Sequence, residues 1–600
     1  MKKALFFLFF PLFIFGQSYS LYDPQTLYEL PGSLYDVDSL KTLKITFYDP
    51  NYNQTLDASY YNNPDFRLPA QVLLDSIHLD SVAIRYKGNS TYTKCNSSIK
   101  KPYNIDFNDI VSGQKLMGKK KMKLSNSWFD PTFLKELMAS RIYKRYLPSY
   151  EVNLMRVFTQ GTYTGLYSNQ EAINKQFLEK HFGEKDGVLI KCDPINMALY
   201  SPNLQYLGAD TSLYYNSYEL KSNHGWEQLM ELTDVLNNTP SNIESILNVD
   251  RVLWYFAVNQ SLLNHDSYNV TMIHNYYLYK SEDGLFQIIP WDLSESFINA
   301  FWGSFPNTNN DPYQIQANSP LVDALLNNPL YRKTYTAHLK TIANESLDTT
   351  WYSSEISSLQ SLAYNSVISD TEKGYSDQDF YTNVYQPSSL NQWTTAAPFL
   401  PVIEDRRTYL LNHAEISMSS PSINNLSVQE DKVMVEVANA NNVELMATIS
   451  TYNSNFQSIP MLDNGTSGDL VSGDGIYTAS LPWSYGGNQV KFYIRAQNNE
   501  ALSLLPQRAE YEFYEYNMPL GVEESSLASN YIVSPNPTNL FVKIQGEVFE
   551  NTNYGIYSLM GKLLKSGLIS PSQKRIDFSG LPNNLYLLKL NNQTYKILKN

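Results

Sequence analysis

Hydrophobic and polar positions from about residue 35 to 416 follow two different periods. The stretches 81–88 (SVAIRYKG) and 103–108 (YNIDFN) alternate with a period of two, which predicts strands. After Asp130, the segment PTFLKELMASRIYKRY follows a helical period, and Pro131 suits the first helical position with Asp130 as its cap. A second helix is predicted after Asp250, and its apolar content indicates that it is well buried. The segment 35–416 is therefore expected to be a mixed α and β domain.

The pattern changes to short strands from 417 to 516. Residues 433–437 and 490–494 alternate between apolar and polar positions, and about 100 residues with this rhythm predict an immunoglobulin-like β-sandwich. Between them, Asp463, Asp469 and Asp474 stand in a segment dense in turn residues. Turn formation is the favoured interpretation and a calcium site is the alternative, because the spacing does not match the twelve-residue helix–loop–helix calcium site.

The two ends of the chain carry their own patterns. The first residues, MKKALFFLFFPLFIFGQSYS, combine two lysines with an apolar run too short to span a bilayer, which predicts a signal peptide at 1–17. No later segment reaches about 18 consecutive apolar residues, so we expect no transmembrane segment in the mature chain. Residues 522–600 form a further small β unit.

Composition narrows the class of protein. A chain of 600 residues exceeds a single core, and an aromatic content of 14% indicates folded material. The net charge of −14 argues against a nucleic-acid partner. Two cysteines, Cys95 and Cys192, cannot make a disulfide framework or a typical zinc site, and a single bridge and two buried thiols both stay open.

The candidate chemistry lies in residues 264–292, NHDSYNVTMIHNYYLYKSEDGLFQIIPWD. Residues 276–280 and 286–289 are predicted to pair as a hairpin around a turn at 281–284. If Lys280 faces Leu285, then Asn275 faces Pro290.

The same register brings Asp292 near Ile273 or His274, at the end of the hairpin where the chain carries Asp266. Two carboxylates there suit phosphoryl transfer. One accepts the proton of an attacking hydroxyl, and the other, aided by an amide oxygen, holds a magnesium ion on the phosphates. Ordinary turns and caps are the alternative for the same residue types, and for His265 and His274 a structural role is favoured.

Eight ordered blocks between residues 81 and 345 resemble the CotH-type (spore-coat protein H) kinases, which are atypical members of the protein-kinase-like group. The blocks are RYKGNST (85–91), KKPYNIDF (100–107), GQKLMGKKKMKLSNSWFDPTFLKELMA (113–139), GTYTGLYSNQEAINKQFLEKHFG (161–183), YELKSN (218–223), NHDSY (264–268), HNYYLY (274–279) and IPWDL (289–293). The resemblance implies an ATP-dependent kinase that uses Mg²⁺ or Mn²⁺. The expected fold class is multidomain, with an α+β atypical protein-kinase-like domain followed by two all-β sandwich domains.

The resemblance implies a role for each candidate residue at the hairpin. Asp266 would be the catalytic aspartate and Asp292 the metal-binding aspartate, with Asn275 as a second metal ligand. For Asn275, hydrogen bonding at the sheet edge is the alternative.

Three further residues are expected to face the nucleotide. Lys101 is the predicted phosphate-contacting lysine, with Lys100 and Lys87 competing for the role, and Glu136 on the helix after Asp130 is its predicted partner. Glu171 is predicted on the nucleotide-facing edge. The alternatives are a solvated strand lysine, a surface acid of a helix, and an acid that stabilises a helix N-terminus.

Two departures from the family pattern bear on activity. The chain has no G-x-G-x-x-G loop, and Ser294 stands two residues after Asp292, where the family often has a second acid. Glu295 follows, but on a strand-like backbone it would point to the opposite face. ATP is also scarce outside the cell.

The last residues resemble the C-terminal sorting domain of type IX secretion in Bacteroidetes-like bacteria. The matching motifs are Pro535-Asn536-Pro537, Gly561-Lys562 and the segment 579–586. The resemblance implies export through the periplasm and outer membrane by the type IX machinery, to the medium or the cell surface.

These observations predict a secreted kinase that transfers the γ-phosphate of ATP to Ser or Thr hydroxyls of extracellular or exported proteins. The alternative is a non-catalytic surface binding or adhesion protein built on a degenerate kinase scaffold. The sequence identifies neither the phosphate acceptor nor the preferred metal nor the oligomeric state.

Overall fold

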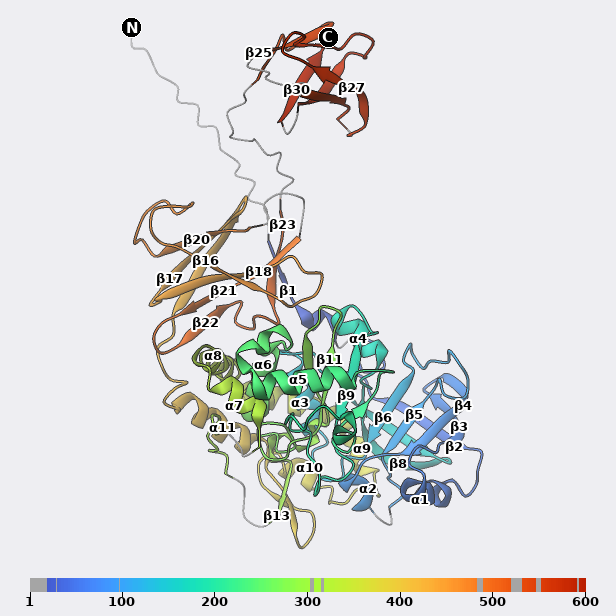
Figure 1. The fold of residues 1–600 in the computed structure, drawn as a ribbon. Helices are drawn as coiled ribbons and strands as arrows, with labels where there is room; N and C mark the ends of the chain where they lie inside the picture. Colours follow the sequence, from blue (N-terminus) through green and yellow to red (C-terminus); the bar gives the residue numbers. More distant parts are fainter. Residues whose placement is uncertain are drawn as a thin grey trace, which may run out of the picture. The chain divides into compact units, whose positions relative to one another are not determined.

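The structure is a computed structural model that describes residues 19–600, except 29, 96–97, 303–306, 315–317, 483–488, 519–530, 546–551, 560 and 591–592. The predicted signal peptide, 1–17, lies outside the described residues. These divide into two compact units, one up to Met518 and one from Tyr531 to the end of the chain (Figure 1). The fold is mixed α and β, with many separate sheets.

A closed barrel forms the first part of the larger unit. Apolar side chains at every second position of its strands fill the barrel core, as at Leu43, Ile45 and Phe47. The predicted strands at 81–88 and 103–108 are both present, as β4 and β5. The barrel consists of β2 (Lys41–Phe47), β3 (Leu68–Leu74), β4 (Ile77–Tyr86), β5 (Tyr103–Asp106), β6 (Lys121–Ser125), β8 (Thr162–Gln170) and β7 (Val152–Thr159), and α1 (Tyr52–Asn62) and α2 (Ser90–Thr93) accompany it.

The helix predicted to begin at Pro131 begins four residues later, as α3 (Lys135–Tyr143). Phe133 has a φ of 59°, a left-handed conformation that a helix cannot include. The prediction of Asp130 as the N-cap is wrong, because Leu134 occupies that position and makes no side-chain cap bond. The Asp130 carboxylate instead accepts the backbone N–H of Lys135, the first residue of the helix, over 2.8 Å. The second predicted helix is confirmed as α6 (Val249–Ser261), which is buried over almost its whole length.

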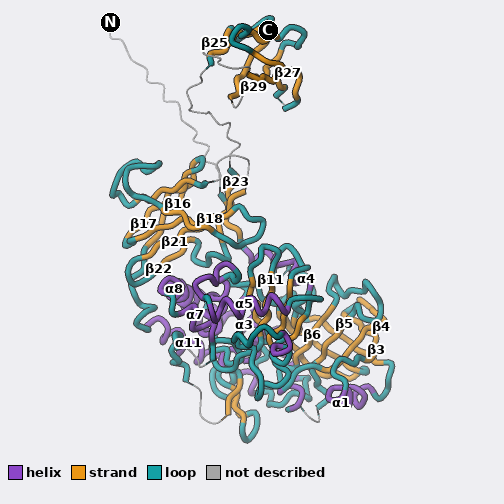
Figure 2. The backbone as a smooth tube through the Cα atoms, viewed as in Figure 1, coloured by secondary structure: helices purple, strands orange, loops and turns teal. Residues whose placement is uncertain are grey.

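A sheet and a group of helices follow the barrel (Figure 2). Their apolar side chains form one large core. The sheet has the order β10 (Glu219–Leu220), β9 (Val188–Cys192), β11 (Tyr276–Lys280) and β12 (Phe286–Pro290). The other elements of this region are α4 (Lys175–Phe182), α5 (Trp226–Asn238), α7 (Pro320–Leu326), α8 (Pro329–Glu345), α9 (Thr349–Ile368), α10 (Asp379–Thr382), α11 (Phe399–Asn412), the short strands β13 (Ala300–Trp302), β14 (Ser388–Ser389) and β15 (Thr394–Ala396), and the 3₁₀ helices η1 (Pro24–Leu27), η2 (Thr211–Tyr214), η3 (Pro240–Ser245) and η4 (Leu293–Ile298).

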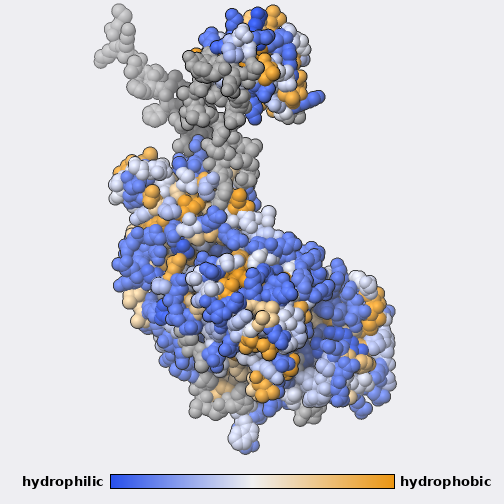
Figure 3. Space-filling model, viewed as in Figure 1, coloured by the Kyte–Doolittle hydropathy of each residue, from blue (hydrophilic) through white to orange (hydrophobic). Residues whose placement is uncertain are grey.

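Buried ion pairs and thiols complete this region. Lys100 and Asp370 pair over 2.5 Å with both side chains fully buried, which ties the barrel to the residues after α9. Cys95 and Cys192 are free and buried, so of the two alternatives the structure has the unbridged thiols. The visible face in Figure 3 is mostly hydrophilic, as expected when the apolar positions fill the cores.

Two facing sheets follow from Ser422 to Asn517. The predicted alternation at 433–437 and 490–494 is confirmed as strands whose valine, phenylalanine and isoleucine side chains enter a shared core. The immunoglobulin-like assignment stays a prediction. One sheet has β16 (Ser422–Gln429), β17 (Lys432–Ala438) and β20 (Ile476–Ser480), and the other has β1 (Ser20–Tyr22), β23 (Phe513–Asn517), β21 (Gln489–Gln497), β18 (Asn442–Thr448), β19 (Gln457–Pro460) and β22 (Leu502–Leu505).

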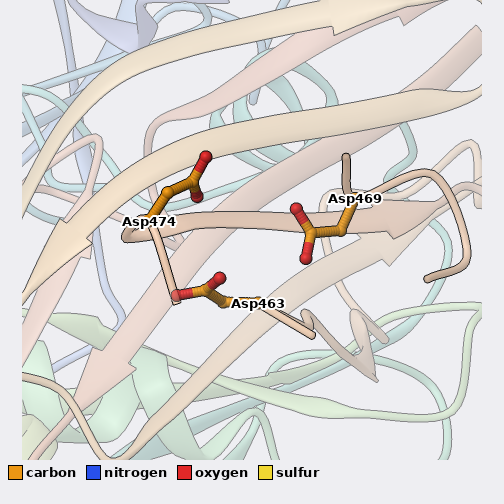
Figure 4. A group of neighbouring side chains, drawn as sticks. All are labelled: Asp463, Asp469 and Asp474. Carbon is orange, nitrogen blue, oxygen red and sulfur yellow. The ribbon is translucent and has the colours of Figure 1, made fainter. Parts of the chain in front are cut away.

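The acidic loop before β20 brings three carboxylates toward one another (Figure 4). One ligand atom from each of Asp463, Asp469 and Asp474 lies within 4.8 Å of the others. Each carboxylate also accepts a backbone N–H group: Asp463 from Gly473 over 2.6 Å, Asp469 from Gly465, and Asp474 from Ile476, the first residue of β20, over 2.9 Å. These bonds fit the turn interpretation, and the grouping of the three carboxylates also fits the calcium alternative, so both stay predictions.

The second compact unit is all β, and its buried isoleucines, leucines and Phe578 form its own core. Asn536, in the predicted Pro-Asn-Pro motif, binds the last strand twice, donating to Lys596 O over 2.7 Å and accepting from Leu598 N over 2.9 Å. Its sheets contain β24 (Ile532–Ser534), β25 (Phe541–Gln545) and β28 (Arg575–Asp577), and β27 (Leu563–Ile569), β26 (Thr552–Tyr557), β29 (Asn584–Leu590) and β30 (Gln593–Lys599).

Candidate functional site

The hairpin formed by β11 and β12 has a register one residue away from the predicted one. Lys280 pairs with Phe286 rather than Leu285, because Leu285 belongs to the turn, where its carbonyl accepts the N–H of Ser281 over 3.1 Å. Asn275 therefore lies opposite Trp291, whose N–H donates to the Asn275 carbonyl over 3.1 Å. The return strand β12 therefore still ends beside the residues that precede β11. Asp292 directly follows Trp291, the partner of Asn275.

Asp266 lies close to His274, which stands two residues before β11. Its Oδ2 is 3.5 Å from Nε2 of His274, and Nδ1 of His274 is 3.8 Å from Oδ1 of Asp193. Burial alone lowers the pKa of His274, but the two carboxylates outweigh burial and raise the pKa to about 9. His274 is thus a cation between two acids. The remaining oxygen, Oδ1 of Asp266, is buried and has no hydrogen-bond partner among the described residues.

Glu136 is joined to Lys87 through the side-chain amide of Gln170. Lys87 Nζ donates to Gln170 Oε1 over 2.6 Å, and Gln170 Nε2 donates to Glu136. Burial first and the Asp292 charge second raise the pKa of Glu136 to about 7, while Lys87 opposes them. The lysine linked to Glu136 in this way is Lys87, by way of Gln170, whereas the predicted partner was Lys101.

Lys101, the favoured lysine in the sequence, lies elsewhere. Its Nζ sits 4.8 Å from the ring centroid of Tyr92, and the competing Lys100 is held by Asp370. Lys123 is not among the predicted site residues, although it belongs to the lysine-rich segment 115–123. Its Nζ lies 3.6 Å from the ring centroid of Trp291, the residue before Asp292.

Glu295 joins the acidic cluster, against the expectation that it points to the opposite face. The backbone after Asp292 is not a strand but the 3₁₀ helix η4, in which three residues make one turn and the third residue returns to the same side. Burial, followed by the charges of Asp266 and Asp292, raises the pKa of Glu295 to about 8. Ser294 donates its hydroxyl to Oδ1 of Asp292 over 2.7 Å.

Glu171 and Asn275 have separate surroundings. Glu171 pairs with Lys119 over 2.7 Å and lies 3.6 Å from Lys180. Burial raises the pKa of Glu171, but the charges of the two lysines outweigh burial and lower it. The ion pair with Lys180 links the residue after β8 to α4. Asn275 has a φ of 59° and is 9% exposed at the head of the hairpin.

A cavity of about 650 Å³ lies between the barrel and the sheet of β9 to β12. It is bounded by the segment that connects β8 to α4, residues 172–174, and its lining includes Leu189 and Tyr277 from the sheet and Lys123 from the barrel. Neither Asp266 nor Asp292 lines this cavity. Its lining residue Lys123 contacts the ring of Trp291, the residue before Asp292.

By their chemistry, Asp292, Glu295 and Asn275 offer the hard oxygen ligands that Mg²⁺ prefers, and the metal site stays a prediction. Among the described residues, Asp463, Asp469 and Asp474 form a group of three acids whose ligand atoms lie within 4.8 Å of one another, and Asp266, Asp292 and Glu295 do not. Oδ1 of Asp266 is a further acceptor: it is buried, and no N–H or O–H group of the described residues donates to it.

The family model described as "CotH kinase protein" matches residues 84–410, more than half of the chain, so this protein belongs to the CotH kinase family. The chain is also 25% identical over 289 residues to the inner spore coat protein H of Bacillus subtilis (strain 168), a match that covers 45% of this chain and 73% of that protein.

The model described as "Secretion system C-terminal sorting domain" matches residues 533–600. A tail of this kind marks a protein exported to the cell surface or secreted. Within the described residues, no helix combines the length and the apolar character needed to cross a membrane.

Proposed function

We propose that this exported CotH-family protein is an ATP-dependent kinase that phosphorylates Ser or Thr hydroxyls of extracellular or exported proteins. The observation that carries the proposal is the Tyr150 hydroxyl, which joins Glu136 of the Lys87–Gln170–Glu136 chain to the backbone beside Asp292. The charges of Asp266 and Asp292 also act on Glu295. Membership of the CotH kinase family supports the same reaction class.

Each residue has a role that its surroundings support. The acceptor hydroxyl oxygen attacks the γ-phosphorus, the bond to the β,γ-bridging oxygen breaks, and the hydroxyl proton passes to Asp266. His274 holds the Asp266 carboxylate in place. Asp292, with Asn275 and Glu295, would hold Mg²⁺, which supplies charge neutralisation to the phosphate oxygens when bound. Lys87 and Lys123 would contact the phosphates.

The test is transfer of labelled γ-phosphate from ATP with Mg²⁺ or Mn²⁺ to Ser/Thr peptides and to the chain itself. Asp266→Asn and Asp292→Asn should each lower the labelling by roughly a hundredfold or more. Equal labelling of the native chain and both variants would contradict the proposal.

The second candidate is a non-catalytic binding protein on the same scaffold, and Ser294 favours it, because a neutral hydroxyl occupies Oδ1 of Asp292. Stabilisation by nucleotide separates the two. A nucleotide at about 100 times its dissociation constant adds roughly 2.7 kcal/mol to the free energy of unfolding. No such gain with any nucleotide and divalent metal would favour the binding protein.

A further inference from the structure

Four polar side chains form a row across neighbouring strands of the barrel. Arg85 of β4 pairs with Asn104 of β5, Asn104 pairs with Lys123 of β6, and Lys123 pairs with Gln170 of β8. The residues on either side of Arg85, Asn104 and Lys123, such as Ile84 and Ile105, face the barrel core, so these three side chains face outward.

Arg67, just before β3, extends this row. Its Nη1 donates to the carbonyl of Asn104 over 3.2 Å and to Oδ1 of Asn104 over 3.4 Å. Arg67, Arg85, Asn104 and Lys123 all line the 650 Å³ cavity. Neighbouring strands are about 4.8 Å apart, so the backbones of Arg85 and Lys123, two strands apart, are separated by about 10 Å. At one end of the row, Lys123 contacts Trp291, the residue before Asp292.

The cations of the row differ from the other lysines of the cavity, which have acidic partners. Lys121 pairs with Asp106 over 2.8 Å, Lys175 with Asp186 over 2.6 Å and Lys185 with Glu179 over 2.7 Å, while Lys191 pairs with Asp193 and Lys221 with Glu219.

Within the described part of the chain, no carboxylate lies within 4.0 Å of Arg67, Arg85 or Lys123. Nε of Arg85 is buried without a hydrogen-bond partner among those same residues. These three side chains therefore have no direct ion pair among those residues, while Asp65 and Glu219, which also line the cavity, act on Arg85 from beyond ion-pair distance. Burial and the neighbouring cations, Lys87 first among them, lower the pKa of Lys123 well below its ordinary value.

We propose that Arg67, Arg85 and Lys123 form a binding row for an oligophosphate chain, either the tail of a nucleotide or a free inorganic oligophosphate. A guanidinium with a free N–H matches phosphate oxygens as a fork, and Lys123 would place one end of the bound chain beside Trp291, which precedes Asp292. The orientation toward Asp292 rests on the proposed function, whereas binding to the row does not.

The experiment measures, by titration calorimetry on the full chain, the binding of tripolyphosphate, ATP, adenosine and hexaglutamate. Tripolyphosphate and ATP should bind more tightly than adenosine, and Arg85→Gln and Lys123→Gln should each weaken tripolyphosphate binding by roughly tenfold or more. Lys44→Gln, the same charge change at an exposed position of β2, should leave the affinity unchanged. Arg85→Lys, which retains the charge, should keep part of the affinity and serves if Arg85→Gln fails to fold.

Binding of ATP alone, weakened by the row variants, would assign the row to a nucleotide tail, and binding of tripolyphosphate alone would assign it to free oligophosphate. Affinities unchanged in both row variants, tighter binding of hexaglutamate, or no binding of any probe would each overturn the proposal. Asp266→Asn separates the two proposals: it should abolish phosphate transfer and retain tripolyphosphate affinity.

Discussion

The hydroxyl of Tyr150 binds Glu136 and the backbone beside Asp292 at the same time. It donates to Oε1 of Glu136 over 2.9 Å and accepts the N–H of Leu293 over 2.9 Å. The helix that carries Glu136 and the segment that carries Asp292 are therefore held by one side chain, which couples the two halves of the candidate site.

Removing this hydroxyl should destabilise the protein. Tyr150→Phe leaves the buried Leu293 N–H without its acceptor and Glu136 without one donor, and we expect a loss of about 1–3 kcal/mol in the free energy of unfolding. Urea denaturation measures it. Tyr385→Phe removes a hydroxyl from a side chain that is 64% exposed and should change little; equal effects of the two variants would contradict the coupling.

Lys87 rather than Lys101 should contact the phosphates. Lys87→Met breaks the bond to Gln170 and removes the cation that faces Glu136 and Asp292, so nucleotide-induced stabilisation and phosphate transfer should both fall by roughly tenfold or more. Lys101→Met should affect them less, because Lys101 packs on Tyr92. Thermal denaturation with and without ATP and Mg²⁺ compares the two, and a larger loss in Lys101→Met would return the role to Lys101.

Glu295 should supply the acid that position 294 lacks. Glu295→Gln removes a carboxylate from the cluster with Asp266 and Asp292 and should raise the Mg²⁺ or Mn²⁺ concentration needed for nucleotide to stabilise the protein. Ser294→Asp in the same chain should restore part of the metal affinity, because its carboxylate lies beside Asp292. A metal titration unaffected by Glu295→Gln would show that Glu295 does not bind the ion.

The buried pair of Lys100 and Asp370 should matter strongly for stability. Asp370→Asn leaves the Lys100 ammonium without its counter-charge, and breaking such a buried pair costs about 3–5 kcal/mol. Chemical denaturation measures the loss. Glu179→Gln, which removes the partner of the exposed Lys185, is the matched control and should have no comparable effect.

A pH dependence is expected where the loop before β23 meets α6. Burial, and then the Asp250 charge, raise the pKa of Glu510 to about 8 from an ordinary value near 4.5. Between these values the folded chain binds a proton that the unfolded chain has released, so this carboxyl makes stability fall as pH rises from about 4.5 to 8.

Glu510→Gln keeps an oxygen to accept from Asn248 Nδ2, a bond of 3.0 Å, and removes the titration. The variant should lose less stability than the native chain between pH 5 and 8, by an amount on the order of a few kcal/mol at about 1.4 kcal/mol per pKa unit. Parallel stability curves of the two proteins against pH would contradict the assignment.

Much of the fold is readable in the sequence because it follows from local periods. Alternating apolar residues predicted β4, β5 and the strands at 433–437 and 490–494, and helical spacing predicted α6. Where one residue broke the local rule, the prediction shifted: Phe133 in a left-handed conformation delays α3, and Leu285 in the turn displaces the hairpin register by one.

The sequence by itself determined the hairpin that returns Asp292 to the loop of Asp266 and the sorting motifs at the C-terminus, because both are encoded by residues close together in the chain. Only the tertiary structure decided which lysine faces Glu136 and where Glu295 points. Lys100 forms its ion pair with Asp370, 270 residues later in the chain, and Gln170 links Lys87 to Glu136 by hydrogen bonds. Such partners depend on packing between distant segments, which no local pattern records.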